Sequence, residues 1–221
     1  MKKANLLFYA LALLGATSIA QDSAYLDIGN VRALVNSDGI LFQNRSNLAP
    51  SYEVPKGNNT HSIFSSSFRI TSESVRNGDQ YIAAILGNPG NVREFRPGPV
   101  DLTMQEGDTS LRFQRLWKLD KNEIDLHRQN WNTSGYTTPQ SILDWPGNGN
   151  ANTARQLAPF ADLDADGVYE PINGEYPIIL GDQAIFLIVN DYRPDFHNIL
   201  VNPQTNDTLY DFFDVAVKVE M

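Results

Sequence analysis

The chain of 221 residues contains no cysteine. This absence excludes disulfides, thiolate metal sites, cysteine nucleophiles and iron–sulfur clusters. Basic residues are also scarce, because 17 lysines and arginines stand against 26 acidic residues and leave a net charge of −9. An acidic chain repels nucleic-acid phosphates and anionic lipids, so we expect neither as a partner.

The common catalytic motifs are missing as well. The chain has no H-E-x-x-H, G-x-S-x-G, phosphate-binding P-loop or G-x-G-x-x-G pattern. Its histidines, His61, His127 and His197, are far apart in the sequence. Asp191, Asp195 and His197 could share a metal, but we interpret them as polar residues of a loop. These absences favour a non-enzymatic protein and leave open only a pair of glycosidase-type catalytic carboxylates, which a single acidic sequence does not single out.

The N-terminus has the pattern of a secretory signal peptide. Two lysines precede an apolar run over residues 4–14, and Ser18 and Ala20 supply small side chains at a cleavage site. We predict that residues 1–20 are removed after Ala20 and that the product is secreted or held on the outer cell surface; a buried N-terminal helix is the alternative. Cleavage would change the charge to 15 − 26 = −11. No later stretch reaches the roughly 18 apolar residues of a membrane span, so we expect none.

The remainder, residues 21–221, is predicted to be an all-β region. Short apolar runs alternate with Gly, Asn and Asp turns, which is typical of antiparallel, sandwich-like folds with long loops. The chain ends inside an alternating strand pattern, so we expect an exported β-rich region truncated at its C-terminal end; a native terminal strand is the alternative. The expected strands cover 30–35, 40–42, 62–71, 80–86, 111–117, 178–189 with a break at 181–182, and 211–221; one or two short helices are expected over 121–129 and 138–144.

A single motif carries specific chemistry. Asp162, Asp164 and Asp166 alternate and are followed by Gly167, which gives a D-x-D-x-D-G run. Alternating carboxylates in a tight turn place hard oxygens around one point, and the glycine supplies the left-handed backbone that the turn needs. Without a cation these neighbouring carboxylates would repel one another. The run therefore predicts a Ca²⁺ site with a structural role, and a solvated acidic turn without metal is the alternative.

The motif does not belong to an EF-hand. Pro159 and Pro171 flank it, so helices on both sides are not expected, and the twelfth position holds asparagine in place of the bidentate glutamate. Another carboxylate must complete the site, and the candidates are Glu170, Glu175 and Asp182, of which Glu170 is nearest. The predicted ligands are Asp162, Asp164, Asp166, the carbonyl of Val168, and Glu170.

An ordered set of short motifs resembles the N-terminal region of large secreted proteins of Bacteroidota. Those proteins typically end in a type IX secretion sorting domain. The resemblance implies an exported or cell-surface protein and no particular activity. This chain departs from the pattern at Arg96, where a tryptophan is expected. The 221 residues include no sorting domain, so the resemblance implies type IX export only if the chain is a fragment of a longer protein. The motifs lie at 30–33, 52–57, 63–64, 95–99, 116–118, 123–124, 144–149 and 162–182.

These observations support three functional hypotheses. The first is a non-enzymatic secreted or cell-surface module with a structural calcium loop, whose role is structural or adhesive and whose partners are glycans or other surface proteins. The second is a calcium-dependent carbohydrate-binding module that stacks sugars on Tyr169, Tyr176, Trp131 and Trp145. The third is the N-terminal part of a secreted glycoside hydrolase, with two carboxylates about 5–9 Å apart.

Overall fold

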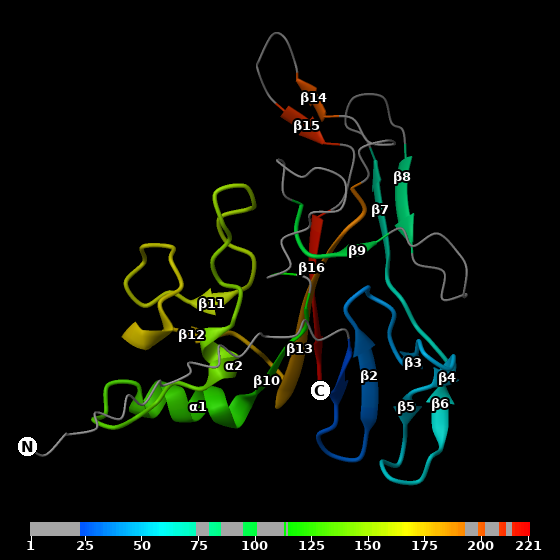
Figure 1. The fold of residues 1–221 in the computed structure, drawn as a ribbon, viewed down its shortest axis with the longest axis horizontal. Coiled ribbons are helices and arrows are strands. Elements are labelled where there is room, and N and C mark those ends of the chain that lie inside the picture. Colours follow the sequence, from blue (N-terminus) through cyan, green and yellow to red (C-terminus); the bar gives the residue numbers. More distant parts are fainter. Residues whose placement is uncertain are drawn as a thin grey trace, which may run out of the picture.

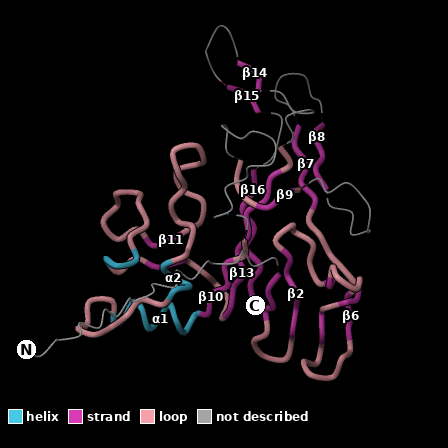
Figure 2. The backbone as a smooth tube through the Cα atoms, in the orientation of Figure 1, coloured by secondary structure: helices cyan, strands magenta, loops and turns pink. Residues whose placement is uncertain are grey.

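A computed structural model describes residues 23–73, 80–84, 95–100, 113, 115–192, 199–201, 208–210 and 214–221. The chain is built mainly from antiparallel strands, with two short α-helices in the described ranges, so the predicted all-β class is confirmed (Figures 1 and 2). The elements are β1 (Ser23–Leu26), β2 (Arg32–Asn36), β3 (Gln43–Asn44), β4 (Ala49–Pro50), β5 (Tyr52–Glu53), β6 (His61–Ile63), β7 (Arg69–Glu73), β8 (Gln80–Ala84), β9 (Arg96–Pro97), β10 (Trp117–Asp120), α1 (Lys121–Asn130), α2 (Gln140–Leu143), β11 (Phe160–Ala161), the 3₁₀ helix η2 (Pro171–Asn173), β12 (Tyr176–Pro177), β13 (Gln183–Asn190), β14 (Ile199–Val201), β15 (Thr208–Tyr210) and β16 (Asp214–Glu220).

Two antiparallel sheets pack face to face around the first hydrophobic core. One sheet has the strand order β1-β2-β5-β6, and the other has the order β10-β13-β16 with β9 also paired to β13. Side chains alternate along a strand, so every second residue of β1 and β2 points toward the second sheet. The buried residues that meet between the sheets include Ala24, Leu26, Ala33 and Val35 from the first and Ile185, Leu187 and Val189 from the second.

Strand β13 is buried on both of its faces. All eight of its residues are buried, which is the signature of a central strand covered on two sides. Ile185 and Leu187 face the first sheet, whereas Phe186 and Ile188 belong to a second hydrophobic core. That second core lies under α1, α2 and the long loops beyond them, which Figure 1 shows on the opposite side of β13 from β1 and β2. β13 therefore connects the sandwich to the layer that carries the acidic motif.

The two predicted helices are present, and one is shorter than expected. The helix predicted over 121–129 is α1. The helix predicted over 138–144 is reduced to α2, because Pro139 has an extended ψ of 144° and stands before the helix rather than inside it. No side-chain hydrogen bond caps the start of α2.

The predicted strands are confirmed in part. The hairpin predicted from 62–71 and 80–86 is present as β7 paired to β8, and the terminal strand is β16, which pairs with β13 along its length. Residues 62–63 instead belong to β6 in the first sheet. Of the stretch predicted over 111–117, residues 111, 112 and 114 lie outside the described residues, and Trp117 is the first residue of β10. The apolar stretch at 178–189 contains one long strand, β13, in place of the expected pair, and before it Leu180 and Gly181 donate their N–H groups to the Glu220 carboxylate at 3.0 and 3.3 Å.

The hairpin expected between 30–35 and 40–42 does not form as a strand pair. β2 pairs with β1 and β5, and Leu41 makes only isolated bridges to Val35 and Ser66. The reason is backbone conformation: Phe42 has φ of 64°, which takes the chain out of the extended region directly after Leu41.

Candidate metal site

Three aspartates converge at the surface on the loop of residues 162–167, which we call the acidic loop. A carboxylate oxygen from each of Asp162, Asp164 and Asp166 lies within 4.8 Å of those of the other two. Asp164 and Asp166 are exposed and Asp162 is half-buried. Hard oxygen ligands at this mutual distance suit a cation such as Ca²⁺, whose ligand distances are about 2.3–2.6 Å. The spacing predicted this convergence, and the structure confirms that the triad could hold a metal ion.

The acidic loop is held by its own carboxylates. Asp162 Oδ2 accepts a hydrogen bond from Gly167 N at 2.9 Å, Asp164 Oδ1 from Asp166 N at 3.2 Å, and Asp166 Oδ1 from Val168 N at 2.7 Å. Gly167 has φ of 76°, as predicted. Ala165 has φ of 61°, a left-handed conformation that is uncommon for a residue with a Cβ atom. The carboxylates are thus fixed on the inside of the turn.

The second oxygen of Asp162 is the most informative atom of the loop. Asp162 Oδ1 is buried, and it has no hydrogen-bond partner among the described residues. A buried carboxylate oxygen without a partner costs free energy, and buried charges in proteins are normally paired or bound to metals. A cation between the three aspartates would supply the missing partner, so the residues present fit a metal ion.

The buried carboxylate of Glu175 holds the acidic loop through hydrogen bonds to the main chain. Its side chain is only 2% exposed, and its Oε1 and Oε2 accept hydrogen bonds from Leu163 N at 3.0 Å and from Glu170 N at 2.7 Å. One buried carboxylate therefore joins the start of the acidic loop to the chain that follows the loop. Sequence reasoning considered Glu175 only as a metal ligand, and the structure gives it this bridging contact instead.

The other predicted ligands are not part of the converging group. Among the described residues, that group contains the three aspartates alone. The Glu170 carboxylate accepts a hydrogen bond from the Asn173 side-chain amide at 3.0 Å, and the Asp182 carbonyl accepts one from Lys121 N at 2.9 Å. Ligation by the Val168 carbonyl and by Glu170 stays a prediction. Asp195 and His197, considered with Asp191 as a metal set, lie outside the described residues.

A neighbouring segment supports the acidic loop from the side. The amide of Asn148 binds both main-chain polar groups of Tyr169, donating to its carbonyl at 2.8 Å and accepting from its N–H at 2.7 Å. Arg155 and Gln156 donate to the carbonyls of Asp166 and Gly167 at 2.8 and 3.2 Å. Sequence reasoning missed these partners, because nothing in residues 148–156 indicates a contact with the acidic loop.

Of the four aromatic residues proposed for sugar stacking, Trp145 and Tyr169 are buried, which corrects the hypothesis for these two, whereas Trp131 is 38% exposed and Tyr176 is half-buried. Trp145 and Tyr169 are buried in the second core, and burial raises the pKa of the Tyr169 hydroxyl. Trp131 packs so closely on Gly174 that a Cβ atom there would lie 2.5 Å from its indole ring. Tyr176 is covered by the Arg128 guanidinium, 4.7 Å from the ring centroid. Each ring is used in packing.

Several carboxylates elsewhere in the chain are held as structural ions. A hydrogen bond from Lys118 lowers the pKa of Asp27, and the N–H groups of Asn59 and Gly57 lower that of Glu53. A general acid of a glycosidase needs the opposite shift, a raised pKa. Burial acts to raise the pKa of Glu220, but the hydrogen bond from Lys218 and the N–H groups of neighbouring residues outweigh it and leave that pKa lowered.

Helix α1 contacts the segment behind the acidic loop through a buried histidine. His127 is fully buried; its Nε2 lies 3.1 Å from the Glu175 carbonyl, to which it donates, and its Nδ1 lies 3.4 Å from the Tyr136 hydroxyl. Burial lowers the pKa of His127, and the carbonyl oxygens at the ring only partly oppose that effect. The neutral imidazole is therefore the form that the fold accommodates.

We expect stability to fall as the pH drops below about 6.5, the ordinary pKa of histidine. The unfolded chain binds a proton there before the folded chain does, so the contribution of neutral His127 is complete above that pH and is lost toward the lowered pKa. Urea unfolding at pH 7.5, 6.5 and 5.5 measures the effect. In His127→Gln the free energy of unfolding should depend less on pH between 7.5 and 5.5, whereas in His61→Gln its dependence on pH should be the same as in the unchanged protein. An equally steep profile in His127→Gln would contradict the assignment.

Comparisons with known protein families, with curated proteins and with solved structures find no significant match to this chain. In the part of the chain that the structure describes, no helix has the length and apolar character required to cross a membrane.

Proposed function

We propose that this chain is an exported, non-enzymatic β-rich module whose acidic loop binds Ca²⁺ as a structural ion. The metal proposal rests on two observations: the carboxylates of the three aspartates converge, and Oδ1 of Asp162, a member of that group, is buried and has no hydrogen-bond partner in the described part of the chain. Asp162, Asp164 and Asp166 would hold the ion, and the Val168 carbonyl and Glu170 are the proposed additional ligands. The ion would neutralise three carboxylates that otherwise repel one another.

The ion would stabilise a layer that few regular elements hold. Between α2 and β13 the described chain has only short strand pairs and a 3₁₀ helix, and it is attached to the sheet through the second core. A chain without cysteine has no disulfide to fasten such a layer. A bound cation adds its binding free energy to the stability of the folded state and so takes that role.

The proposed setting is the cell exterior. Residues 1–20 have the order of charge, apolar run and small residues that signal peptides have, and the motifs at 30–33 through 162–182 resemble the N-terminal region of type IX secretion cargo of Bacteroidota. Both features support a module of a secreted or cell-surface protein with a structural or adhesive role. Millimolar extracellular calcium would suit a loop with few ligands.

Calcium should raise the melting temperature of the protein, and a chelator should reverse the rise. At a concentration about 100 times Kd the expected gain is about 2.7 kcal/mol, or roughly 5–10 °C for a chain of this size. Scanning fluorimetry in EDTA, Ca²⁺ and Mg²⁺ measures it, with a smaller shift for Mg²⁺ because Mg²⁺ gives up its water reluctantly.

The matched variants are Asp162→Asn and Asp125→Asn. Asp162→Asn keeps the shape of the side chain but replaces a negatively charged carboxylate of the acidic loop with a neutral amide. It should therefore abolish most of the rise in melting temperature that calcium causes. The second removes an exposed carboxylate on α1 that pairs with Arg128, and it should keep the shift in full. Equal melting temperatures in EDTA and Ca²⁺, together with no metal by elemental analysis, would overturn the calcium proposal.

A further inference from the structure

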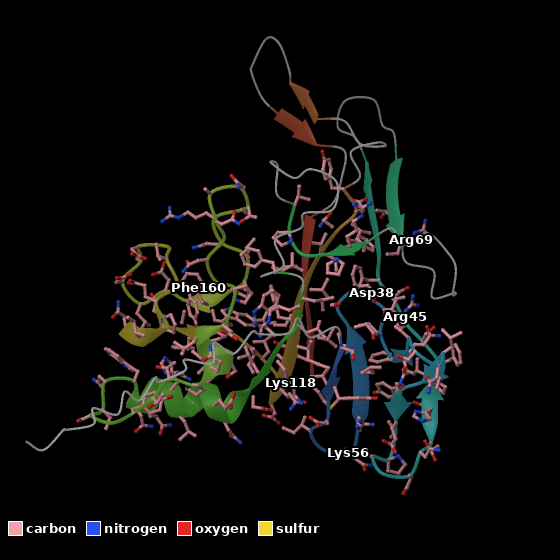
Figure 3. All side chains as sticks on the ribbon, in the orientation of Figure 1. Asp38, Arg45, Lys56, Arg69, Lys118 and Phe160 are labelled. Carbon is pink, nitrogen blue, oxygen red and sulfur yellow. The ribbon has the colours of Figure 1, made fainter. Side chains whose placement is uncertain are left out.

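The sheet that contains β13 has a long outer edge at β16. Its strand order is β10-β13-β16, and in the described part of the chain β16 pairs with β13 alone. β16 is also the longest outer strand among the described elements. The opposite edge of the sheet is formed by the shorter strands β9 and β10, and Figure 3 labels Lys118 on the latter. An outer strand presents a row of main-chain N–H and C=O groups to a further strand.

The register of β16 shows which of its main-chain groups point outward. Met221 and Gln183 exchange two main-chain hydrogen bonds of 2.9 and 3.0 Å. Such pairs alternate along an antiparallel ladder, so the odd-numbered residues of β16 direct their N–H and C=O groups at β13. The even-numbered residues Ala216, Lys218 and Glu220 direct theirs away from it. Among the described residues these outward groups have no hydrogen-bond partner.

The side chains of β16 leave part of this edge open. The odd-numbered valines pack against the first hydrophobic core. Lys218 Nζ donates to the Ile178 carbonyl at 2.9 Å and lies 2.8 Å from the Glu220 carboxylate, so both charged side chains are held at residues 178–181 of the same chain. Ala216 is exposed, and its side chain is a single methyl group. The outward groups at Ala216 are therefore the easiest for another strand to reach.

We propose that two copies of this chain form a symmetric dimer by antiparallel pairing of their β16 strands about Ala216. The strand of a second copy has the properties that this edge requires, because β16 contains no proline or glycine and alternates valine with other residues. With a two-fold axis at Ala216, the alanines of the two copies exchange two hydrogen bonds. Val215 then lies opposite Val217 of the second copy, so apolar side chains continue along the core face of the joined sheet.

Charge distinguishes this register from its neighbours. An axis at Ala216 places Asp214 of each copy opposite Lys218 of the other, and unlike charges on opposite strands stabilise a sheet. An axis at Val217 would place Asp214 opposite Glu220, and an axis at Lys218 would place two lysines opposite each other. Like charges in these positions are destabilising, so the Ala216 register is the favoured one.

The pairing has a closed symmetry and a small contact area. One two-fold contact uses the β16 edges of both copies, so assembly through this edge stops at the dimer. Because the contact consists of one strand pair, the dimer belongs to the class of small, weak interfaces. β16 is not part of the acidic loop, so the dimer does not rest on the calcium proposal.

Sedimentation velocity of the purified protein tests the proposal. Concentrations of about 10–500 µM suit an interface of this small class, and salt of about 0.15 M screens the repulsion between two acidic copies. The sedimentation coefficient should rise from the monomer value toward the dimer value over this range, equally in EDTA and in Ca²⁺. A monomer at every concentration, or growth beyond the dimer, would overturn the proposal.

A matched pair of lysine variants locates the contact. Ala216→Lys puts two like charges at the two-fold axis and should weaken dimerisation about tenfold or more. Ala151→Lys adds the same charge at an exposed position of a loop and should dimerise as the unchanged protein does. Both positions are exposed, so both variants should keep the melting temperature. Equal dimerisation of the two variants would place the contact elsewhere and overturn the assignment.

A cysteine cross-link tests the same register without adding a charge. The chain has no cysteine of its own, so a single introduced thiol can report on the contact. Residues of a hydrogen-bonded pair have Cα atoms about 5.5 Å apart, within the range that a disulfide spans. Ala216→Cys should form a disulfide-linked dimer under mild oxidation at least tenfold faster than Ala151→Cys. Equal rates of cross-linking in these two variants would contradict the pairing about Ala216.

Discussion

Replacing Phe186 by alanine is expected to lower the free energy of unfolding by about 3–5 kcal/mol, the range for a buried phenylalanine. Phe186 is 2% exposed and points from the middle of β13 into the second core. Its ring centroid lies 4.9 Å from that of Trp145 and 5.9 Å from that of Trp117. Truncation would leave a cavity between two indole rings that strands and helices hold in place. Urea unfolding followed by tryptophan fluorescence measures the loss.

Phe64→Ala is the matched control. The Phe64 side chain is 58% exposed, so its truncation should change the stability by less than about 0.5 kcal/mol. A small effect of Phe186→Ala, equal to that of the control, would contradict the second core and with it the attachment of the outer layer to β13.

The sandwich could be predicted because its strands are local patterns. Residues 31–35 and 215–219 alternate in the sequence, and such alternation indicates a strand with one buried face. β13 is apolar throughout, so periodicity does not assign its side chains to one face or the other. Only the tertiary structure shows that its odd-numbered residues face the first sheet and its even-numbered residues face the helices.

The turns were harder to predict than the strands. The Asp-Gly step at 38–39 indicates a reversal, and Gly39 indeed has φ of 82°. Nothing in the residue type indicates that Phe42 is left-handed, because aromatic residues rarely adopt that conformation. The chain after the turn therefore leaves the expected hairpin, and Leu41 bridges to Ser66 as well as to Val35.

The acidic triad could be predicted because its members are two residues apart, so the spacing alone brings their oxygens together. The residues that support it are distant or ambiguous. Asn148 reaches Tyr169 across 21 positions, and Glu175 was one of several acidic residues after the motif.

Glu175 joins two features that the sequence presents separately, the acidic loop and helix α1. Its carboxylate accepts from Leu163 N in the loop and from Glu170 N just after it, and its carbonyl accepts from His127 of α1. Because the side chain is buried, no water can readily replace it when it is removed. The position of the three aspartates thus depends on a residue that is not itself one of them.

We expect Glu175→Ala to lower the stability of the calcium-free protein by about 2–5 kcal/mol, because two main-chain N–H groups lose their acceptor in a buried setting. Glu175→Gln should have an intermediate effect, since its amide keeps one acceptor oxygen. Calcium affinity should also fall. Without the Glu175 carboxylate the ion itself must order the acidic loop, and the free energy of that ordering is subtracted from the free energy of calcium binding. Urea unfolding in EDTA measures the first effect, and calorimetric titration with Ca²⁺ measures the second.

The control for Glu175→Ala is Asp125→Ala, which removes an exposed carboxylate from α1 and should change neither quantity by more than about 0.5 kcal/mol. The order of the three variants is the decisive result. If Glu175 only bridges the loop, the stability falls in EDTA, and glutamine recovers part of both the stability and the calcium affinity. If Glu175 were a direct ligand, stability in EDTA would be unchanged, and glutamine and alanine would lose calcium to a similar extent. That second pattern would contradict the bridging role.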